Sequence, residues 1–393
     1  MPVGYLVTVA AVAVATLLAL VPLRRPRLLA DLSFRLTLVL NEVPFLCFCW
    51  LLACTAWAFS QGDVQSLVGW ATVGLAGAST AGLAVLARNG LRAGPVAEQA
   101  LAEALGADWR TSIDPGTAAG LRRRLPLGRI LVVPFFRRRR DVRRTANIGY
   151  GDAGRRNLLD VYHHRSRPSG GPVLIHLHGG GYDRGRKNSH SLPLIHRLAS
   201  RGWVCISANY RLRSDARHPD HLIDLKRVIA WVRENGHAYG ADPSKLFASG
   251  SSAGAHLAAL AALTPNDPAF QPGFESVDTT VTAAVCLNGY YGNYYGQGPD
   301  SSPLAYVGPD APPFFIAHGD HDTVVPVATA RRFAEALREA SANPVVYAEL
   351  PGAQHAFDLF HSFRFEHVVD AVESFAAHIN THEKATDATH GRP

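Results

Sequence analysis

The first part of the chain consists of long apolar runs that are almost free of charge. Residues 3–23 and 64–87 contain no charged residue, and residues 38–59 contain one acid near their start. At about 1.5 Å per residue, each run can cross a hydrocarbon layer of roughly 30 Å. The pattern predicts three transmembrane helices over these ranges, in a membrane region that ends at residue 88. The middle helix is the least regular, since Asn41 and Glu42 fall in its first turn, where the interface tolerates polar groups.

A cleaved secretory signal is the alternative for the first run. Such a signal carries its positive charges before the apolar segment, whereas Arg24, Arg25 and Arg27 follow it here. Together with Arg35 they give the first connection four arginines, and the second connection, 60–63, has none. The positive-inside rule places the arginine-bearing connection in the cytoplasm. The sequence therefore predicts a multi-pass protein of the cell membrane whose residues after 88 are cytoplasmic.

Residues 89–146 are expected to be a linker, with a short helical stretch at 97–105. The formal net charge of +7 is concentrated in it, because residues 121–144 hold ten Arg and one acid, a net +9 that leaves −2 for the rest. An apolar patch at 131–136 lies between the arginines, a combination that suits the anionic cytoplasmic leaflet. A solvated arginine face beside a core strand is an open alternative. A nucleic-acid patch is disfavoured, since no recognisable nucleic-acid module follows.

From residue 147 to about 380, short apolar runs alternate with helical stretches. Strands are predicted at 156–162, 172–177, 203–208, 245–249, 282–287, 314–318 and 345–350. Helices are expected between them, for example at 220–239, 253–263, 327–341 and 363–379. This alternation predicts an α/β domain with a mostly parallel sheet, helices on both faces, and a site where strands end. Residues 381–393 are expected to be a disordered tail.

Composition narrows the functional classes. With 47% hydrophobic and 18% charged residues the chain is expected to fold rather than to remain disordered. It has only five cysteines and no C-x-x-C pair, which excludes a disulfide-built scaffold and predicts no metal site.

Two glycine-rich turns follow predicted strands. The first is His178, Gly179, Gly180 and Gly181, where successive glycines leave backbone N–H groups free to face a ligand oxygen. The second matches G-x-S-x-G between a strand and a helix, with Ser252 flanked by Ser251 and Ala253 and by the glycines Gly250 and Gly254. A nucleotide-binding sheet is disfavoured, since neither G-x-G-x-x-G after the first strand nor Gly-Lys-Ser/Thr is present.

A serine hydroxyl needs a base to become a nucleophile, and the base needs an acid to orient it. His355 follows the last predicted strand, while His361, His367 and His378 fall in a helical stretch. Asp322 follows the preceding strand, so it and His355 lie on consecutive strand-end loops. Asp320 is the alternative acid, with a helix cap as its structural role. Since these side chains and backbone amides handle the developing charge, no cofactor is expected.

Residues 147–380 resemble the α/β-hydrolase superfamily, and within it the hormone-sensitive-lipase-like and feruloyl-esterase-like carboxylesterases. The matching segments are 178–181, 209–211, 239–243, 250–254, 318–326 and 352–357. The resemblance implies that Asp322 is the acid and that the amides of Gly180, Gly181 and Ala253 form the oxyanion hole. Many hormone-sensitive-lipase-like members carry Asp where this chain has Ser251. Residues 251–256 also resemble membrane-bound prenylcysteine methylesterases.

The loop between the strands at 282–287 and 314–318 contains Tyr290, Tyr291, Tyr294 and Tyr295 among glycines. It predicts an open, aromatic-lined pocket for short to medium acyl groups, with ordinary surface packing as the alternative. The sequence thus predicts a membrane-anchored serine carboxylesterase that acts on an ester substrate, with a lipid ester as one candidate. A prenylcysteine methylesterase, a serine peptidase and a catalytically silent binding module remain alternatives, and no oligomeric state is predicted.

Overall fold

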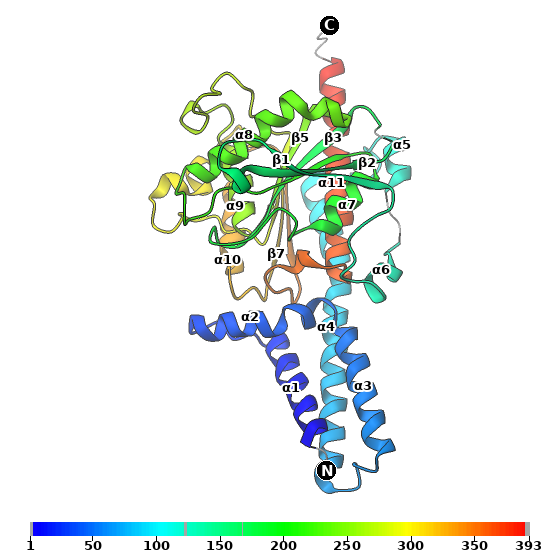
Figure 1. Ribbon diagram of the computed structural model, residues 1–393. Helices are drawn as coiled ribbons and strands as arrows, with labels where there is room; N and C mark the ends of the chain where they lie inside the picture. The colour runs from blue at the N-terminus through cyan, green and yellow to red at the C-terminus, as the bar shows by residue number, and fades with distance from the viewer. Residues whose placement is uncertain (1–2, 122–123, 167, 390–393) are drawn as a thin grey trace.

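The computed structural model describes residues 3–121, 124–166 and 168–389. Arg122 and Arg123 of the arginine-rich segment and the last four residues of the expected tail lie outside this range. Figure 1 shows a sheet covered by helices that stands on a narrower bundle of N-terminal helices. The chain between 381 and 389 is helical rather than a disordered tail, because the last helix continues through it.

Four helices make up the N-terminal part: α1 (Val3–Leu20), α2 (Arg27–Glu42), α3 (Pro44–Ser60) and α4 (Leu67–Leu105). In Figure 1, α1, α3 and the first half of α4 run side by side, and α2 lies across their upper end. Judged by length and composition, α1 and α4 are each able to cross a membrane, and α2 with α3 passes only as a pair bent by 85°. Two or three helices could therefore span a membrane.

The bend between α2 and α3 differs from the continuous helix expected over 38–59. It falls at Val43, whose φ of −130° and ψ of 55° are not helical, and Pro44 then occupies the first turn of α3. Proline disfavours the helical conformation in the residue before it and has no N–H to continue the ladder. Residues 38–42 consequently belong to the crosswise helix α2.

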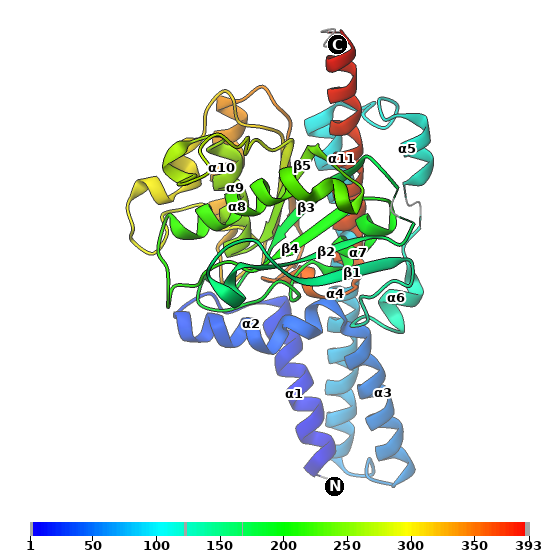
Figure 2. The same ribbon diagram turned by 45° about the horizontal axis from the view of Figure 1, so that its top comes forward.

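Helix α4 also differs from the expected linker at 89–105. It continues unbroken for 39 residues, roughly 58 Å, from the bundle into the upper domain. There Ala93, Ala97 and Leu101 are buried in the same core cluster as the last helix, α11 (Phe363–Thr389). Figures 1 and 2 both show the two helices side by side. A Cβ on Gly94 would lie 2.6 Å from the His367 ring, so the close approach requires glycine there.

The sheet has eight strands in the order β1-β2-β4-β3-β5-β6-β7-β8. Pairs β1–β2 and β2–β4 are antiparallel and all others are parallel, which confirms the predicted α/β fold. The strands are β1 (Val142–Gly149), β2 (Leu158–His164), β3 (Gly171–Leu177), β4 (Val204–Ala208), β5 (Ala241–Ser251), β6 (Ala283–Leu287), β7 (Phe314–Gly319) and β8 (Val345–Leu350). Strand β1 was not expected, because it is a mostly exposed edge strand without an apolar run.

Helices cover both faces of the sheet. One core cluster joins α4 and α11 to α7 (Leu192–Ser200) across one face. Two further clusters join the other face to α8 (Asp220–Asn235), α9 (Ala253–Leu263) and α10 (Val327–Ala340). Neighbouring strand residues alternate between the two sides, as in Leu174 and Ile175, because successive side chains of a strand point to opposite faces. Short helices α5 (Pro115–Gly120) and α6 (Leu127–Leu131) lie between α4 and the sheet in sequence.

The carboxyl-terminal edge of the parallel strands faces the N-terminal helices (Figures 1 and 2). At this junction Glu42 forms an ion pair with Arg364, and both side chains are at most 2% exposed. Ser362 Oγ donates a second hydrogen bond to Glu42, at 2.7 Å. Removing one partner of such a buried pair costs about 3–5 kcal/mol, so the contact fixes α2 against the loops at this edge.

Candidate active site

Ser252 occupies the sharp turn between β5 and α9. Its φ of 54° and ψ of −117° are rare for a residue with a side chain and cost about 1–3 kcal/mol. The turn is held by the Ser252 N–H, which donates to the Leu287 carbonyl at 2.8 Å. A Cβ on Gly250 would lie 2.1 Å from the Gly254 carbonyl carbon, and one on Gly254 would lie 2.2 Å from the Leu177 oxygen. Both flanking glycines are therefore required by the tightness of the turn.

The structure brings the predicted base and acid to this serine. His355 Nε2 lies 3.0 Å from Ser252 Oγ, and His355 Nδ1 lies 2.7 Å from Asp322 Oδ2. The second carboxylate oxygen, Oδ1, accepts the N–H groups of Val324 and Val325 at 2.8 and 2.7 Å. These bonds hold the carboxylate plane, which in turn fixes the His355 ring with its Nε2 toward the serine.

The electrostatics of this chain favour a charged acid beside a basic imidazole. Burial by itself would raise the pKa of Asp322, but the charge of His355 and hydrogen bonds from His318 and His355 lower it well below its ordinary value. For His355, burial would lower the pKa, but the charge of Asp322, the hydrogen bond to Asp322 and the charge of Asp358 together raise it. Asp322 thus stays ionised while His355 accepts a proton, which is the arrangement that general-base activation of a serine requires.

The other candidate residues lie elsewhere. Asp320 Oδ1 accepts the Gly352 N–H at 2.7 Å and so holds the loop that leads to His355. His361 is not helical but is buried just before α11, where it pairs with Glu366. His367 lies on α11 against Gly94, and His378 Nδ1 lies 2.9 Å from Ser112 Oγ. None of these four residues is placed against Ser252.

The glycine turn after β3 lies beside the serine, since a Cβ on Gly179 would be 3.0 Å from Ser252 Cβ. Gly180 has a φ of 126° and Gly181 one of 60°, and a Cβ on Gly180 would collide with the Arg184 carbonyl. Within the described part of the chain, the N–H groups of Gly180, Gly181 and Ala253 donate no hydrogen bond to another protein group. They are available to an oxyanion beside Ser252.

His178, which opens this turn, supports it from behind. Its ring stacks on Tyr210 at 4.4 Å, and its Nδ1 bonds the Gly179 carbonyl at 2.7 Å. Burial lowers the pKa of His178 to about 3. The ring is therefore neutral and acts as a packed spacer, with no proton to exchange near neutral pH.

Sequence reasoning missed a second buried carboxylate, Asp358, three residues beyond His355. Its Oδ2 accepts the Ser251 and Ser191 hydroxyls at 2.5 and 2.6 Å, and its Oδ1 accepts Asn288 Nδ2 at 3.2 Å. The serine turn, the start of α7 and the end of β6 thus meet on one side chain of the histidine loop. The one sequence signal of Asp358 is an acid inside the apolar run Ala-Phe-Asp-Leu-Phe.

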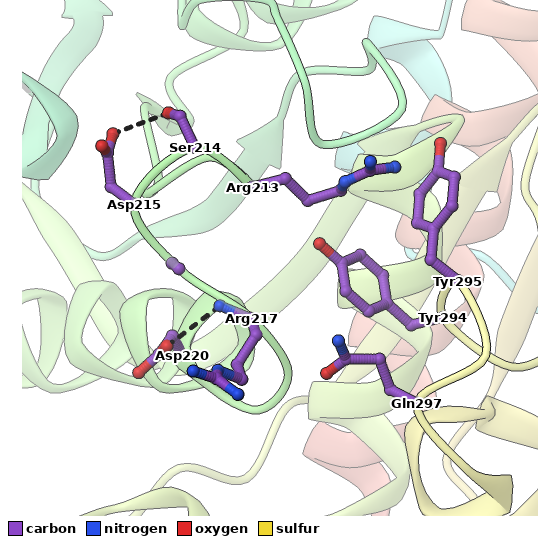
Figure 3. Close-up of a pocket in the computed structure, with 9 residues that line it drawn as sticks. Arg213, Ser214, Asp215, Arg217, Asp220, Tyr294, Tyr295 and Gln297 are labelled. Atoms are coloured by element: carbon purple, nitrogen blue, oxygen red, sulfur yellow. Dashed lines mark hydrogen bonds between the residues drawn. The ribbon is translucent and has the colours of Figure 1, made fainter.

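The four tyrosines of the loop after β6 divide into two groups. Tyr294 and Tyr295 line a cleft of about 620 Å³ together with polar residues of the segment before α8 (Figure 3). Tyr295 donates its hydroxyl to the Gly181 carbonyl at 3.1 Å, and the Arg213 guanidinium lies 4.0 Å over its ring. Tyr291, by contrast, is fully buried and stacks on Phe333. Tyr290 is exposed and bonds the Asn293 carbonyl, so neither it nor Tyr291 lines this cleft.

Comparison with known proteins points to one kind of chemistry. The family described as BD-FAE matches residues 159–292 and 282–337. A probable carboxylic ester hydrolase, LipM of Mycobacterium tuberculosis, is 39% identical over 96% of this chain and 93% of its own length. Esterase LipQ of the same organism is 42% identical over 72% and 74%. A truncated carbohydrate esterase from gut microbiota, 23% identical, shares the fold with a TM-score of 0.52 over 60% of this chain and 96% of that one.

Replacing each candidate acid distinguishes their roles. We expect Asp322→Asn to lower kcat by about 10³-fold or more, because the amide no longer stabilises a protonated His355. The acid limb of kcat/KM against pH should also move to lower pH, since Asp322 raises the pKa of His355. Asp320→Asn is the matched control and should retain most activity. An Asp320→Asn variant that is the more damaged of the two would contradict the assignment.

Asp358 should act by positioning the turn and not by proton transfer. We expect Asp358→Asn to lower kcat by about 10-fold with a smaller change in KM, because the serine turn loses a charged acceptor. The acid limb should again move to lower pH, since the Asp358 charge also raises the pKa of His355. A pH profile identical to that of the wild type would show that its role is structural support alone.

Proposed function

We propose that this protein, which belongs to the α/β-hydrolase family of carboxylic ester hydrolases, is a membrane-anchored serine esterase that works through Ser252, His355 and Asp322. The observation that carries the proposal is the unbroken chain of contacts from Ser252 Oγ through both His355 nitrogens to Asp322. The lowered pKa of Asp322 and the raised pKa of His355 suit an ionised acid beside a basic imidazole.

The reaction follows from the arrangement of these groups. Ser252 Oγ attacks the ester carbonyl carbon while His355 Nε2 takes its proton, and the carbonyl oxygen becomes an oxyanion facing the amides of Gly180, Gly181 and Ala253. His355 then gives the proton to the departing alcohol, which leaves an acyl ester on Ser252. His355 then takes a proton from a water molecule, whose oxygen attacks the acyl carbonyl carbon. As the bond to Ser252 Oγ breaks and the acid leaves, His355 returns the proton to Oγ, and the free serine is regenerated.

Anchoring and orientation are part of the proposal. The catalytic domain stands at the end of the helical bundle that carries Arg24, Arg25 and Arg27, whereas the opposite end, at 60–66, carries Asp63 and no arginine. The positive-inside rule favours a cytoplasmic position for the arginine-bearing end. The catalytic domain would then be cytoplasmic.

The cleft that Tyr294 and Tyr295 line supports short to medium acyl chains as substrates. Tyr295 joins this cleft to the glycine turn through its bond to the Gly181 carbonyl, and most of the other lining residues are polar. A pocket of about 620 Å³ falls within the range of small-molecule sites. Methyl esters of prenylated cysteine and peptides are the alternative substrates to compare with simple esters.

The direct test is labelling of the serine together with a substrate series. Wild-type protein in detergent should react with a fluorophosphonate probe and hydrolyse aryl esters, with the highest kcat/KM between acetyl and octanoyl chains. Ser252→Ala should lose both properties while retaining the same unfolding midpoint, and Ser244→Ala, at the far end of β5, should lose neither. Peptide and prenylcysteine substrates are assayed beside the esters. Labelling that persists in Ser252→Ala would contradict the proposed nucleophile.

Orientation is tested with fusions to a reporter that is active only outside the cytoplasm. We expect activity when the reporter is inserted at Gln61, between α3 and α4, and none when it follows the C-terminus, because the two sites lie on opposite sides of the membrane in the proposed topology. The reverse pattern would place the catalytic domain outside.

A further inference from the structure

Helix α2 carries its apolar and polar residues on unexpected sides. Its residues packed against the protein include Ala30, Ser33, Thr37 and Asn41, all nearly inaccessible. Its outward side carries Leu28, Leu29, Leu32, Leu36 and Val39, which are 37–79% exposed, together with the exposed ion pair of Arg35 with Asp31. A surface helix in water turns its apolar side inward. The outward leucines of α2 therefore indicate an apolar or interfacial neighbour.

This helix also forms one border of the active site. The Phe34 ring meets the His355 ring edge-on at 5.8 Å, and Thr323, next to Asp322, donates its hydroxyl to the Ala30 carbonyl at 3.0 Å. Asn41 Nδ2 bonds the Gly352 carbonyl at 2.9 Å in the loop before His355. The loops that carry the acid and the base are thus held by the same helix that exposes its leucines.

A second exposed apolar surface contacts the histidine loop from another side. Leu131, Val132, Val133, Phe135 and Phe136 are 41–76% exposed. The Phe135 ring packs edge-on against Phe360 at 5.1 Å, and the Pro134 carbonyl accepts the His361 N–H at 2.9 Å. The segment 355–361, from the base to this contact, therefore connects α2 to the loop 131–136.

The position and the charge of these two surfaces indicate that a lipid interface covers them. Helix α2 is bent by 85° from α3, with which it could form one broken membrane span, and lies across the end of the bundle (Figure 1). Exposed arginines flank both surfaces, with Arg25 and Arg27 at α2 and Arg138 and Arg140 beside the loop 131–136. Apolar side chains with adjacent cations fit a lipid interface bearing anionic headgroups. A surface that binds a partner protein would not need to adjoin helices that can cross a membrane, whereas α2 directly adjoins them.

We propose that the leucine side of α2 and the loop 131–136 lie in the headgroup region of an anionic bilayer, and that the active site between them takes esters directly from the lipid. The inference rests on the proposed esterase function and specifies its substrate class as esters dissolved in a membrane. If both surfaces are buried in the interface, Ser252, behind Phe34 and His355, lies next to the lipid. No rearrangement of the protein is needed for this.

The experiment uses the full chain in vesicles of phosphatidylcholine with phosphatidylglycerol. Two fluorogenic substrates are compared, a long-chain ester that dissolves in the bilayer and a short-chain ester that dissolves in water. The variant Leu28→Gln/Leu32→Gln/Leu36→Gln should hydrolyse the bilayer ester about tenfold more slowly, because its apolar anchoring is lost, and should hydrolyse the soluble ester at close to the wild-type rate. Leu28→Met/Leu32→Met/Leu36→Met is the matched control and should keep both rates.

Charge is tested separately from apolarity. In wild-type protein, hydrolysis of the bilayer ester should rise with the fraction of phosphatidylglycerol and fall with salt. The variant Arg25→Gln/Arg27→Gln/Arg138→Gln/Arg140→Gln should respond more weakly to both, with an unchanged rate on the soluble ester.

The outcomes separate this inference from the proposed function. A wild-type protein that is inactive on both substrates would overturn the esterase proposal and the inference with it. If the wild type is active but the variant with Gln at Leu28, Leu32 and Leu36 retains full activity on the bilayer ester, the inference alone is overturned. Equal loss of activity on both substrates in that variant would overturn it too. Equal unfolding midpoints for the Gln and Met variants confirm that the comparison reports on lipid access.

Discussion

The buried ion pair between Glu42 and Arg364 positions the N-terminal helices against the edge of the sheet that carries Ser252, His355 and Asp322. It joins the end of α2, at the head of the helical bundle, to the start of α11, directly after the loop that carries His355. A buried charge without its partner is strongly destabilising, so the N-terminal helices and the catalytic edge of the sheet share one geometry. Helix α4 reinforces it by running without a break from the bundle into the core of the α/β domain. The domain is thus joined to its helices by a buried ion pair and by a continuous helix.

The catalytic edge combines backbone strain at Ser252 with buried charges on both sides of the serine turn. Ser252 is kept in an unfavourable backbone conformation by the glycines that allow β3, β5 and α9 to approach closely. Two buried carboxylates then act on either side of the turn: Asp322 on His355, and Asp358 on Ser251. Since Asp358 lies on the same loop as His355, displacement of that loop would disturb nucleophile and base together.

Helix α2 contacts the loops of the candidate active site on one side and faces the surroundings of the protein on the other. Its small and polar residues pack on the catalytic loops while its leucines face outward, an arrangement that water would disfavour and a lipid interface would stabilise. The carboxyl-terminal edge of a parallel sheet is the ordinary location of a ligand site. In this protein that edge faces the apolar N-terminal helices, so the proposed access of the site to lipid would follow from the same orientation.

Much of this could be predicted from residue order, because the relevant signals are local. Seven of the eight strands, the turn at Ser252, the glycines after β3 and the pairing of Asp322 with His355 on neighbouring loops each follow from short patterns in the chain. Periodicity also indicates apolar helices before the catalytic domain, though it misses the break at Pro44 and the continuation of α4 beyond residue 88. Only the tertiary structure decides that Asp358 accepts a hydrogen bond from Ser251 and that Asp320 accepts one from Gly352. The same is true of the packing of Phe34 against His355. These contacts join residues up to several hundred positions apart, and which of them forms depends on how the elements pack, which no local pattern encodes.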